Sequence, residues 1–368
     1  MFPFVPFCSF MTDATFLRRV RGRGAVSNQS GRFEPTTRSE VDDGWHRQPE
    51  DRLPTTVMAD TARHVITYNR SPDLGFDRTI NPYRGCEHGC IYCYARPSHA
   101  YWGFSPGQDF ETKLFAKFDA AEVLRKELSA PAYRPEFILL GANTDAYQPI
   151  EREHKITRGI LKVLLEFRHP VGTVTKSGTV MRDADLWAEL ATKRLGHVTI
   201  SLTTLDRKLA RTMEPRASAP ARRLEAIRTL TNAGVPVCVN VAPIIPGLND
   251  HEIEPILEAA KDAGAQEAAY TLLRLPLEIK DLFREWLAEH YPDRADKVES
   301  LIRQTRGGAL YRSAFGERMK GTGPYADQIR QRFRLAAKRH GLDRRGLALR
   351  TDLFTVPPAP GQQLQLAL

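Results

Sequence analysis

Short apolar runs alternate with amphipathic stretches through the middle of the chain, from about residue 80 onward. Six runs have the length and the branched or aromatic residues typical of strands: residues 78–83, 137–141, 171–176, 198–203, 236–243 and 268–275. Helical periodicity lies between them, most clearly in residues 156–167, 218–234 and 252–264, and the last two of these end on a glycine. The pattern therefore predicts strands that alternate with helices.

Strands and helices that alternate in this way form parallel βαβ units with right-handed crossovers. Six units are two fewer than a full (β/α)8 barrel has, so we predict an α/β fold, a partial (β/α)6 TIM-like barrel that is open on one side. The rival is a doubly wound open sheet, but no G-x-G-x-x-G loop follows the first strand. We place the barrel core in residues 61–276, a largely extended or disordered N-terminal arm in 1–60, and a helical extension with a loose tail in 277–368.

The alternation within two of these strands assigns their faces. Valines occupy every second position at the start of 236–243 and are expected to face the helices, as are Ile200 and Leu202 in the preceding strand. The opposite, inward positions hold small or polar residues: Cys238, Asn240, Ala242, Ser201 and Thr203. Because a packed barrel interior repeats bulky branched residues, these positions predict a lumen that holds a ligand.

Composition and charge limit the setting. The chain has 42% hydrophobic and 26% charged residues, and no run approaches the roughly 18 apolar residues of a membrane span. The opening MFPFVPFCSF lacks the basic start of a signal peptide, so we expect a cytoplasmic protein without membrane attachment; Met11 is an alternative start to Met1. The net charge of +9 gathers in the arm sequence RRVRGRG (residues 18–24) and in the helical stretch 325–342. Each basic segment is either a solvated surface or a phosphate-binding surface that gives weak nucleic-acid binding.

Three of the five cysteines fall within eight residues of the segment NPYRGCEHGCIYCYARPSH, at Cys86, Cys90 and Cys93. Three thiolates at this spacing can converge on one soft metal centre. A closed structural zinc site takes four ligands; no second cysteine pair exists, although His88 or His99 is available as a fourth ligand. A four-iron cluster held by only three cysteines instead keeps one iron open for chemistry, since fully ligated clusters take four.

The spacing Cys-x3-Cys-x-aromatic-Cys, with Tyr92 before the last cysteine, resembles the signature of the radical S-adenosylmethionine (SAM) superfamily. Further segments across about residues 70–276 resemble its spore photoproduct lyase-like branch, often labelled DNA repair photolyases: TDAYQPIE, TKSGTVMRD, TMEPRASAPARRLEAI and VAPIIPGLND. The leading GRGAVSNQSGRFE resembles a bacterial subgroup of that branch.

The resemblance implies a [4Fe–4S] cluster on Cys86, Cys90 and Cys93. It further implies that the open iron chelates S-adenosylmethionine, whose reductive cleavage yields a 5′-deoxyadenosyl radical that abstracts hydrogen from a substrate. The electron would come from a flavodoxin- or ferredoxin-like donor. The resemblance does not name the substrate. Spore photoproduct lyase has a cysteine hydrogen donor in the region that here reads GANTDAYQP, without cysteine, which argues against repair of that lesion.

Other cofactor contacts are expected at the C-terminal ends of the strands, where barrel sites lie. We expect Asn143, Thr144 and Asp145 to accept from the cofactor's amino group, and Lys176 to neutralise its carboxylate. Ser201 and Asn240 are expected to meet the ribose hydroxyls, and Tyr92 is expected to lie near the adenine. Simpler roles are a turn cap for Asp145 and a surface charge for Lys176.

Cys238 is a candidate hydrogen donor to a substrate radical, and a small buried side chain is the simpler explanation. A simpler role is also open for Glu214 and Arg216, which is to pair with each other and hold their loop. Two functions besides a radical enzyme of unknown substrate stay open. One is repair or modification of nucleic acid by the same chemistry, and the other is a non-catalytic iron–sulfur or zinc module.

Overall fold

A computed structural model describes residues 20–34, 53–343 and 348–358 of the chain. Its central sheet has the strand order β10-β9-β8-β7-β6-β3-β2. The strands are β2 (Ile66–Tyr68), β3 (Arg78–Ile80), β6 (Ile138–Leu140), β7 (Val171–Thr175), β8 (Gly196–Ser201), β9 (Val237–Ile244) and β10 (Glu267–Leu272). All neighbours from β3 to β10 pair in parallel, and β2 adds an antiparallel edge strand. The six predicted strands are therefore confirmed, and no strand pairing among the described residues closes the sheet into a full barrel.

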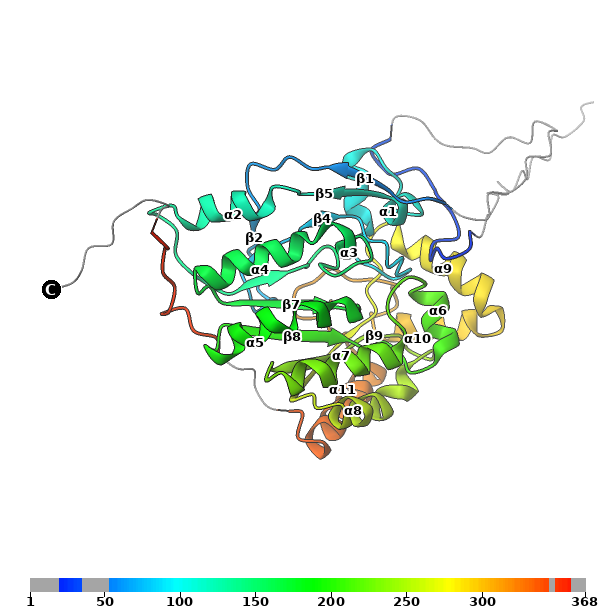
Figure 1. The fold of residues 1–368 in the computed structure, drawn as a ribbon. Coiled ribbons are helices and arrows are strands. Elements are labelled where there is room, and N and C mark those ends of the chain that lie inside the picture. The colour runs from blue at the N-terminus through cyan, green and yellow to red at the C-terminus, as the bar shows by residue number, and fades with distance from the viewer. Residues whose placement is uncertain (1–19, 35–52, 344–347, 359–368) are drawn as a thin grey trace, which may run out of the picture.

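Helices cover one face of this sheet (Figure 1). The connection after β6 contains α3 (Glu151–His154) and α4 (Ile156–Glu166), and the one after β7 contains η2 (Gly178–Asp183) and α5 (Ala184–Thr192). The connection after β8 contains α6 (Arg207–Met213) and α7 (Pro220–Asn232), and the one after β9 contains η3 (Asp250–Glu252) and α8 (Ile253–Asp262). The three helical stretches expected from periodicity correspond to α4, α7 and α8. The α2 helix (Ala120–Leu128) packs beside α4.

The predicted faces of β8 and β9 are confirmed. Val237, Val239 and Val241 are buried in the main core together with apolar residues of α7 and α8. The alternate positions Cys238 and Asn240 are only partly buried, on the face away from these helices. Because Ser201 pairs with Asn240 across the two strands, their side chains lie at the same level of the lumen.

A second sheet was missed by the pattern of apolar residues. It has the order β1-β5-β4 and consists of β1 (Thr56–Ala59), β5 (Lys113–Ala116) and β4 (Tyr83–Arg84). Its strands are two to four residues long, which is too short for a period of two to stand out in the sequence. Between β4 and β5 lie η1 (Arg96–Trp102) and α1 (Asp109–Thr112), so this sheet frames the cysteine segment.

The C-terminal region is helical as expected, with α9 (Ile279–His290), η4 (Pro292–Arg294), α10 (Ala295–Gln304) and α11 (Pro324–Arg339). The α11 helix packs on α8 and places Phe333 against Tyr270 of β10, with their ring centroids 4.6 Å apart. It therefore covers one edge of the barrel, as the simpler interpretation of stretch 325–342 predicted. No helix of the described residues combines the length and apolar character needed to cross a membrane.

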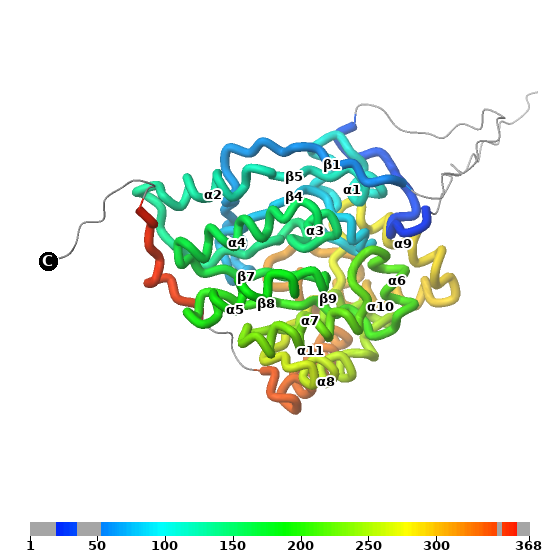
Figure 2. The backbone as a smooth tube through the Cα atoms, viewed as in Figure 1, coloured from blue at the N-terminus to red at the C-terminus, as the bar shows by residue number. Residues whose placement is uncertain are grey.

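Part of the predicted arm is integrated into the fold. Residues 20–34 form no helix or strand, yet Val20, Ala25 and Val26 are buried. Ser27 donates a hydrogen bond to Glu285, so this segment runs beside α9 (Figure 2). These fifteen residues are extended, in agreement with one of the two predicted descriptions, but they pack onto the fold. Residues 1–19 and 35–52 lie outside the described part. The domain limits at residues 60 and 276 stay predictions.

Candidate functional site

The cysteine segment connects β4 to η1 at the C-terminal end of the parallel strands. Cys86 and Cys90 are buried, Cys93 is partly buried, and all three are free thiols. Burial raises the pKa of Cys86 well above its ordinary value, and the neighbouring Cys90 and Cys93 raise it further. Burial likewise raises the pKa of Cys90 to about 12. The thiols therefore lie within electrostatic reach of one another and must lose protons when they bind a metal.

Three free thiols in one loop are a donor set whose chemistry fits a four-iron cluster with one open iron. Among the residues that the structure describes, no group of three or more His, Cys, Asp or Glu side chains is placed so that it could hold a single metal ion. Both alternative fourth ligands have polar neighbours of their own. His88 Nδ1 lies 3.2 Å from Asp145 Oδ2, and His99 Nε2 lies 2.8 Å from the Lys113 carbonyl oxygen.

Polar side chains from two elements hold the backbone of the cysteine loop. The Thr144 hydroxyl donates to the Gly85 carbonyl at 2.7 Å, and the Glu87 amide donates to Gln148 Oε1 at 2.8 Å. On the other side, Arg96 Nε donates to the Cys90 carbonyl at 2.9 Å. Because Thr144 and Gln148 follow β6, the loop is fixed directly to the end of a barrel strand.

The N-terminal segment is clamped onto the same loop by a buried ion pair. Arg96 donates to Glu111 at 2.5 Å, and neither side chain is exposed to solvent. The Glu111 carboxylate also accepts the backbone N–H groups of Gly24 and Ala25, both at 2.9 Å. Gly24 is so close to Gly89 that an added Cβ would lie 1.8 Å from the Gly89 carbonyl oxygen. The clamp therefore fixes the backbone immediately before Cys90.

We expect Gly24→Ala to loosen this clamp, because a real Cβ cannot approach a carbonyl oxygen to 1.8 Å. Overpacking of this kind costs about 1–3 kcal/mol of unfolding free energy. We also expect a lower iron content after anaerobic reconstitution, since the Cys90 loop must shift. Chemical denaturation and iron analysis measure the two effects.

Gly75→Ala is the matched control, because its Cβ would meet nothing within 4 Å and its φ is not in the left-handed region. That variant should stay within about 0.5 kcal/mol of the parent. Equal stability and equal iron content in the two variants would contradict the clamp.

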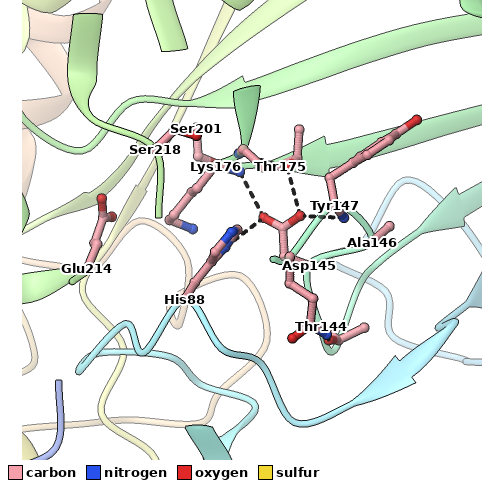
Figure 3. Close-up of polar contacts among 12 residues, drawn as sticks. His88, Thr144, Asp145, Ala146, Tyr147, Thr175, Lys176, Ser201, Glu214 and Ser218 are labelled. Carbon is pink, nitrogen blue, oxygen red and sulfur yellow. Dashed lines mark hydrogen bonds and ion pairs between the residues drawn. The ribbon is translucent and has the colours of Figure 1, made fainter. Parts of the chain in front are cut away.

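Asp145 connects the cysteine loop to the ends of β6 and β7 (Figure 3). Its carboxylate accepts hydrogen bonds from the Tyr147 amide at 2.9 Å, the Thr175 hydroxyl at 2.7 Å and the Lys176 amide at 2.8 Å, and it faces His88. Burial alone would raise the pKa of Asp145, but His88 and these hydrogen bonds lower it well below its ordinary value. Asp145 is thus an ionised carboxylate that links two strand ends to the loop.

Lys176 lies directly after β7 and reaches into the same region. Its ammonium is 5.7 Å from the centroid of the Tyr92 ring and points between His88 and Glu214 in Figure 3. Burial lowers the pKa of Lys176, but Cys90 and Glu214 outweigh this effect and raise it overall. Across residues 20–34, 53–343 and 348–358, no carboxylate forms an ion pair with this ammonium. Lys176 is therefore a protonated cation whose charge no ion pair of the described residues offsets.

A buried polar network lies behind Lys176. The Glu214 carboxylate accepts hydrogen bonds from Arg223, from the Tyr92 hydroxyl and from the Thr203 hydroxyl, the last at 2.6 Å. Burial raises the pKa of Glu214, but Arg223 and then Lys176 lower it below its ordinary value. The network therefore holds Tyr92, one residue before the third cysteine, in a fixed position.

The simpler pairing of Glu214 with Arg216 is wrong. Glu214 turns inward to Arg223, whereas Arg216 points to Glu87 of the cysteine loop, with 3.0 Å between Nη2 and Oε1. Two charges separated by one residue suggested a local bond. The end of α6 instead directs the two side chains to different neighbours.

The other expected contact residues differ in their surroundings. Asn143 is exposed, and its backbone N–H donates to Asn81 Oδ1 at 2.8 Å. Ser201 is buried at the end of β8, and Asn240 Oδ1 is buried without a hydrogen-bond partner in the described part of the chain. Cys238 is the second residue of β9, toward the end of the strand remote from the cysteine loop, and burial raises its pKa to about 12.

The sequence analysis missed Arg96, Glu111, Gln148 and Arg223. Each of them acts through a partner that is not adjacent in sequence, and Glu111 and Gly24 are 87 residues apart. The only signal in the sequence was the glycine pair in RGRG, which permits close backbone approach.

Comparisons with known proteins agree on one family. The family model described as Radical SAM superfamily matches residues 80–260. An uncharacterized protein of Mycobacterium tuberculosis is 37% identical over 251 residues, which cover 67% of this chain and 73% of that protein. An uncharacterized protein of Methanocaldococcus jannaschii is 28% identical over 220 residues, which cover 60% of this chain and 78% of that protein.

Solved structures of spore photoproduct lyase have the same fold. The structure complexed with dinucleoside spore photoproduct has a TM-score of 0.55 at 16% identity, and the match covers 77% of this chain and 79% of that chain. A mutant of that enzyme, with a TM-score of 0.54 over the same shares of the two chains, contains bound AdoMet together with the dinucleoside. At this identity the likeness concerns the fold alone.

Proposed function

We propose a function from the premise that this chain belongs to the radical SAM superfamily. It is accordingly an enzyme, and its cofactors are a [4Fe–4S] cluster and S-adenosylmethionine. When bound and reduced by one electron, these cofactors supply a 5′-deoxyadenosyl radical that abstracts hydrogen from a substrate. The protein's part is to bind the cofactors, orient them and exclude water.

Cys86, Cys90 and Cys93 are the cluster ligands in this proposal. The observation that carries it is a single loop that is hydrogen-bonded to the residues after β6 and offers three free thiols, with Lys176 beside the Tyr92 ring of the same loop. The clamp through Arg96 and Glu111 supports the loop from behind, so that the thiols keep their positions while they exchange protons for iron.

Lys176 binds the carboxylate of S-adenosylmethionine, because its ammonium lies beside Tyr92 of the cysteine loop and no carboxylate in the described part of the chain pairs with it. The amino group lies against 143–145, where the exposed Asn143 side chain offers an acceptor. Asp145 already accepts three hydrogen bonds and faces His88, so its part is to hold this segment in place. Two lumen residues meet the ribose hydroxyls: Ser201 and Asn240, whose Oδ1 is buried and lacks a partner. Tyr92, held by Glu214, lies next to Lys176 and lines the adenine side.

The test is the response of the reduced cluster to S-adenosylmethionine, followed by electron paramagnetic resonance after anaerobic reconstitution. We expect the cofactor to change the spectrum of the wild-type protein. In Lys176→Ala the half-saturating concentration of S-adenosylmethionine should rise about 10- to 100-fold, because the variant loses one charged hydrogen bond to the cofactor. Iron content should stay the same, because Lys176 is not a cluster ligand.

Lys193→Ala is the control, since Lys193 is an exposed lysine paired with Glu189 at 3.2 Å. A wild-type spectrum that does not change when S-adenosylmethionine is added would contradict the proposed function. Equal half-saturation in Lys176→Ala and Lys193→Ala would instead make Lys176 an ordinary charge at the end of a strand.

A nucleic-acid substrate is the second candidate. The α11 helix supports it, because Arg334, Lys338 and Arg339 are exposed along its surface. The basic arm supports it less than expected. Arg23 is buried and donates to the Glu111 carbonyl at 2.9 Å, so it is not available to a phosphate, and residues 18 and 19 lie outside the described part.

A further inference from the structure

Two arginines meet at the end of β10, three strands away from β7, which Lys176 follows. Arg274 lies two residues after the strand, and its guanidinium is 4.8 Å from the ring centroid of Tyr94, the residue that follows Cys93. Arg306, which follows α10, donates to the Leu273 carbonyl at 2.7 Å and to the Glu317 carbonyl at 2.9 Å. The second arginine thus supports the backbone that carries the first.

Neither guanidinium has an acidic partner among the described residues. The Nε atoms of both arginines are buried without a hydrogen-bond partner in the described part of the chain, and Arg274 donates a side-chain hydrogen bond to Met319 Sδ at 3.6 Å. Arg274 is partly buried and Arg306 is fully buried. Two other fully buried arginines are instead neutralised by carboxylates. Arg96 pairs with Glu111 and Arg223 with Glu214.

The charges of this pair are close enough to oppose each other. Burial lowers the pKa of Arg306 to about 10; Arg274 contributes to that decrease, and Tyr311 and Glu317 oppose it. The adjacent Arg318 is already neutralised by Asp73 at 2.5 Å. Because a buried cation without an ion-pair partner is costly, an anion bound beside the two arginines would stabilise them.

We propose that Arg274, backed by Arg306, binds an oxyanion of the substrate, either a phosphate or a carboxylate. The planar guanidinium can donate hydrogen bonds to two oxygens of such a group at once, which a lysine ammonium does not do. Tyr94 lies between this group and Cys93, so the bound oxyanion would be held beside the cluster loop. The proposal rests on the proposed function, because it takes the lumen opening as the active site.

Lys176 and Arg274 would bind two different anions. Lys176 follows β7 and Arg274 follows β10, three strands apart, which is about 14 Å along a sheet. One cation therefore serves the carboxylate of S-adenosylmethionine, and the other is left for the substrate. The substrate class is consequently anionic, with the reacting carbon within reach of the region between the two cations.

The experiment titrates reconstituted enzyme containing S-adenosylmethionine with inorganic phosphate and with acetate by calorimetry, at matched ionic strength. We expect saturable binding, with the tighter anion identifying phosphate or carboxylate. Arg274→Gln should weaken it by about tenfold or more, the size of one charged hydrogen bond. The anion affinity of Arg274→Lys should lie between those of the wild type and Arg274→Gln, because lysine keeps the positive charge but loses the planar set of N–H donors.

Arg312→Gln is the matched control, since it removes the same charge from an exposed arginine of the neighbouring loop. Binding that is absent for both anions, or that is unchanged in Arg274→Gln, would overturn the proposal. A loss of iron or of the S-adenosylmethionine response in Arg274→Gln would also overturn it, by assigning Arg274 to the cofactors. Wild-type protein that binds the anion through Arg274 but ignores S-adenosylmethionine would support the oxyanion site and contradict the proposed function.

Discussion

Replacing Cys86, Cys90 or Cys93 by alanine is expected to abolish iron loading. Three thiolates are all the ligands that the protein offers to the cluster, and the loss of one leaves two irons without a protein ligand. The effect should be equally severe at all three positions, because none of the other described cysteines lies near enough to substitute. Iron and sulfide analysis after anaerobic reconstitution measures it, together with the visible absorbance of the cluster.

Cys238→Ala is the control for this experiment. Cys238 lies near the start of β9, remote from the cysteine loop, so the variant should load iron as the parent does. The same variant tests the hydrogen-donor hypothesis, which requires normal iron and normal cleavage of S-adenosylmethionine with loss of the substrate product. A full iron complement in any of the three loop variants would refute the ligand assignment.

Arg96→Met is expected to cost about 3–5 kcal/mol of unfolding free energy, which is the typical cost of removing one partner of a buried ion pair. The substitution leaves the Glu111 carboxylate buried without its cation and frees the carbonyls of Cys90, Pro106 and Gly107. Chemical denaturation of the metal-free protein measures the loss without interference from the cluster.

Arg125→Met supplies the comparison, because Arg125 and Glu166 form an equally short ion pair at the surface, with 47% and 41% of their side chains exposed. An exposed pair of this kind contributes about 0–1 kcal/mol. If the two variants lost the same stability, the Arg96–Glu111 pair would not be the support of the cysteine loop that its geometry indicates.

The strands and their faces were accessible from the sequence because they depend on neighbours along the chain. Val237, Val239 and Val241 alternate with small or polar residues, and successive side chains of a strand must point to opposite faces. The two faces can therefore be assigned without knowing which strands are neighbours. The helices α4, α7 and α8 were recognisable for the same reason, from a period of 3.6 residues. The small second sheet was not, because its strands are too short to show a period.

Within the site, only the cysteines could be identified from spacing alone, because all three ligands lie in one loop. Asp145 and Lys176 were chosen as residues that follow strands, and the structure brings them together at the same place, although their contacts with a cofactor stay predictions. The lysine's lack of an acidic partner could not be known in advance, since it depends on Glu214 turning to Arg223.

The sequence by itself thus determined the alternating α/β architecture and the loop that offers three thiols, because both follow from local periods and spacings. Which charges are buried and which are paired depends on the tertiary structure. Arg23, part of a basic run in the sequence, is buried and donates to the Glu111 carbonyl, whereas Arg96, unremarked in the sequence, is buried in an ion pair with the Glu111 carboxylate. The physical reason is that the state of a charge depends on burial and on partners that are distant along the chain, and neither is a property of the neighbouring residues.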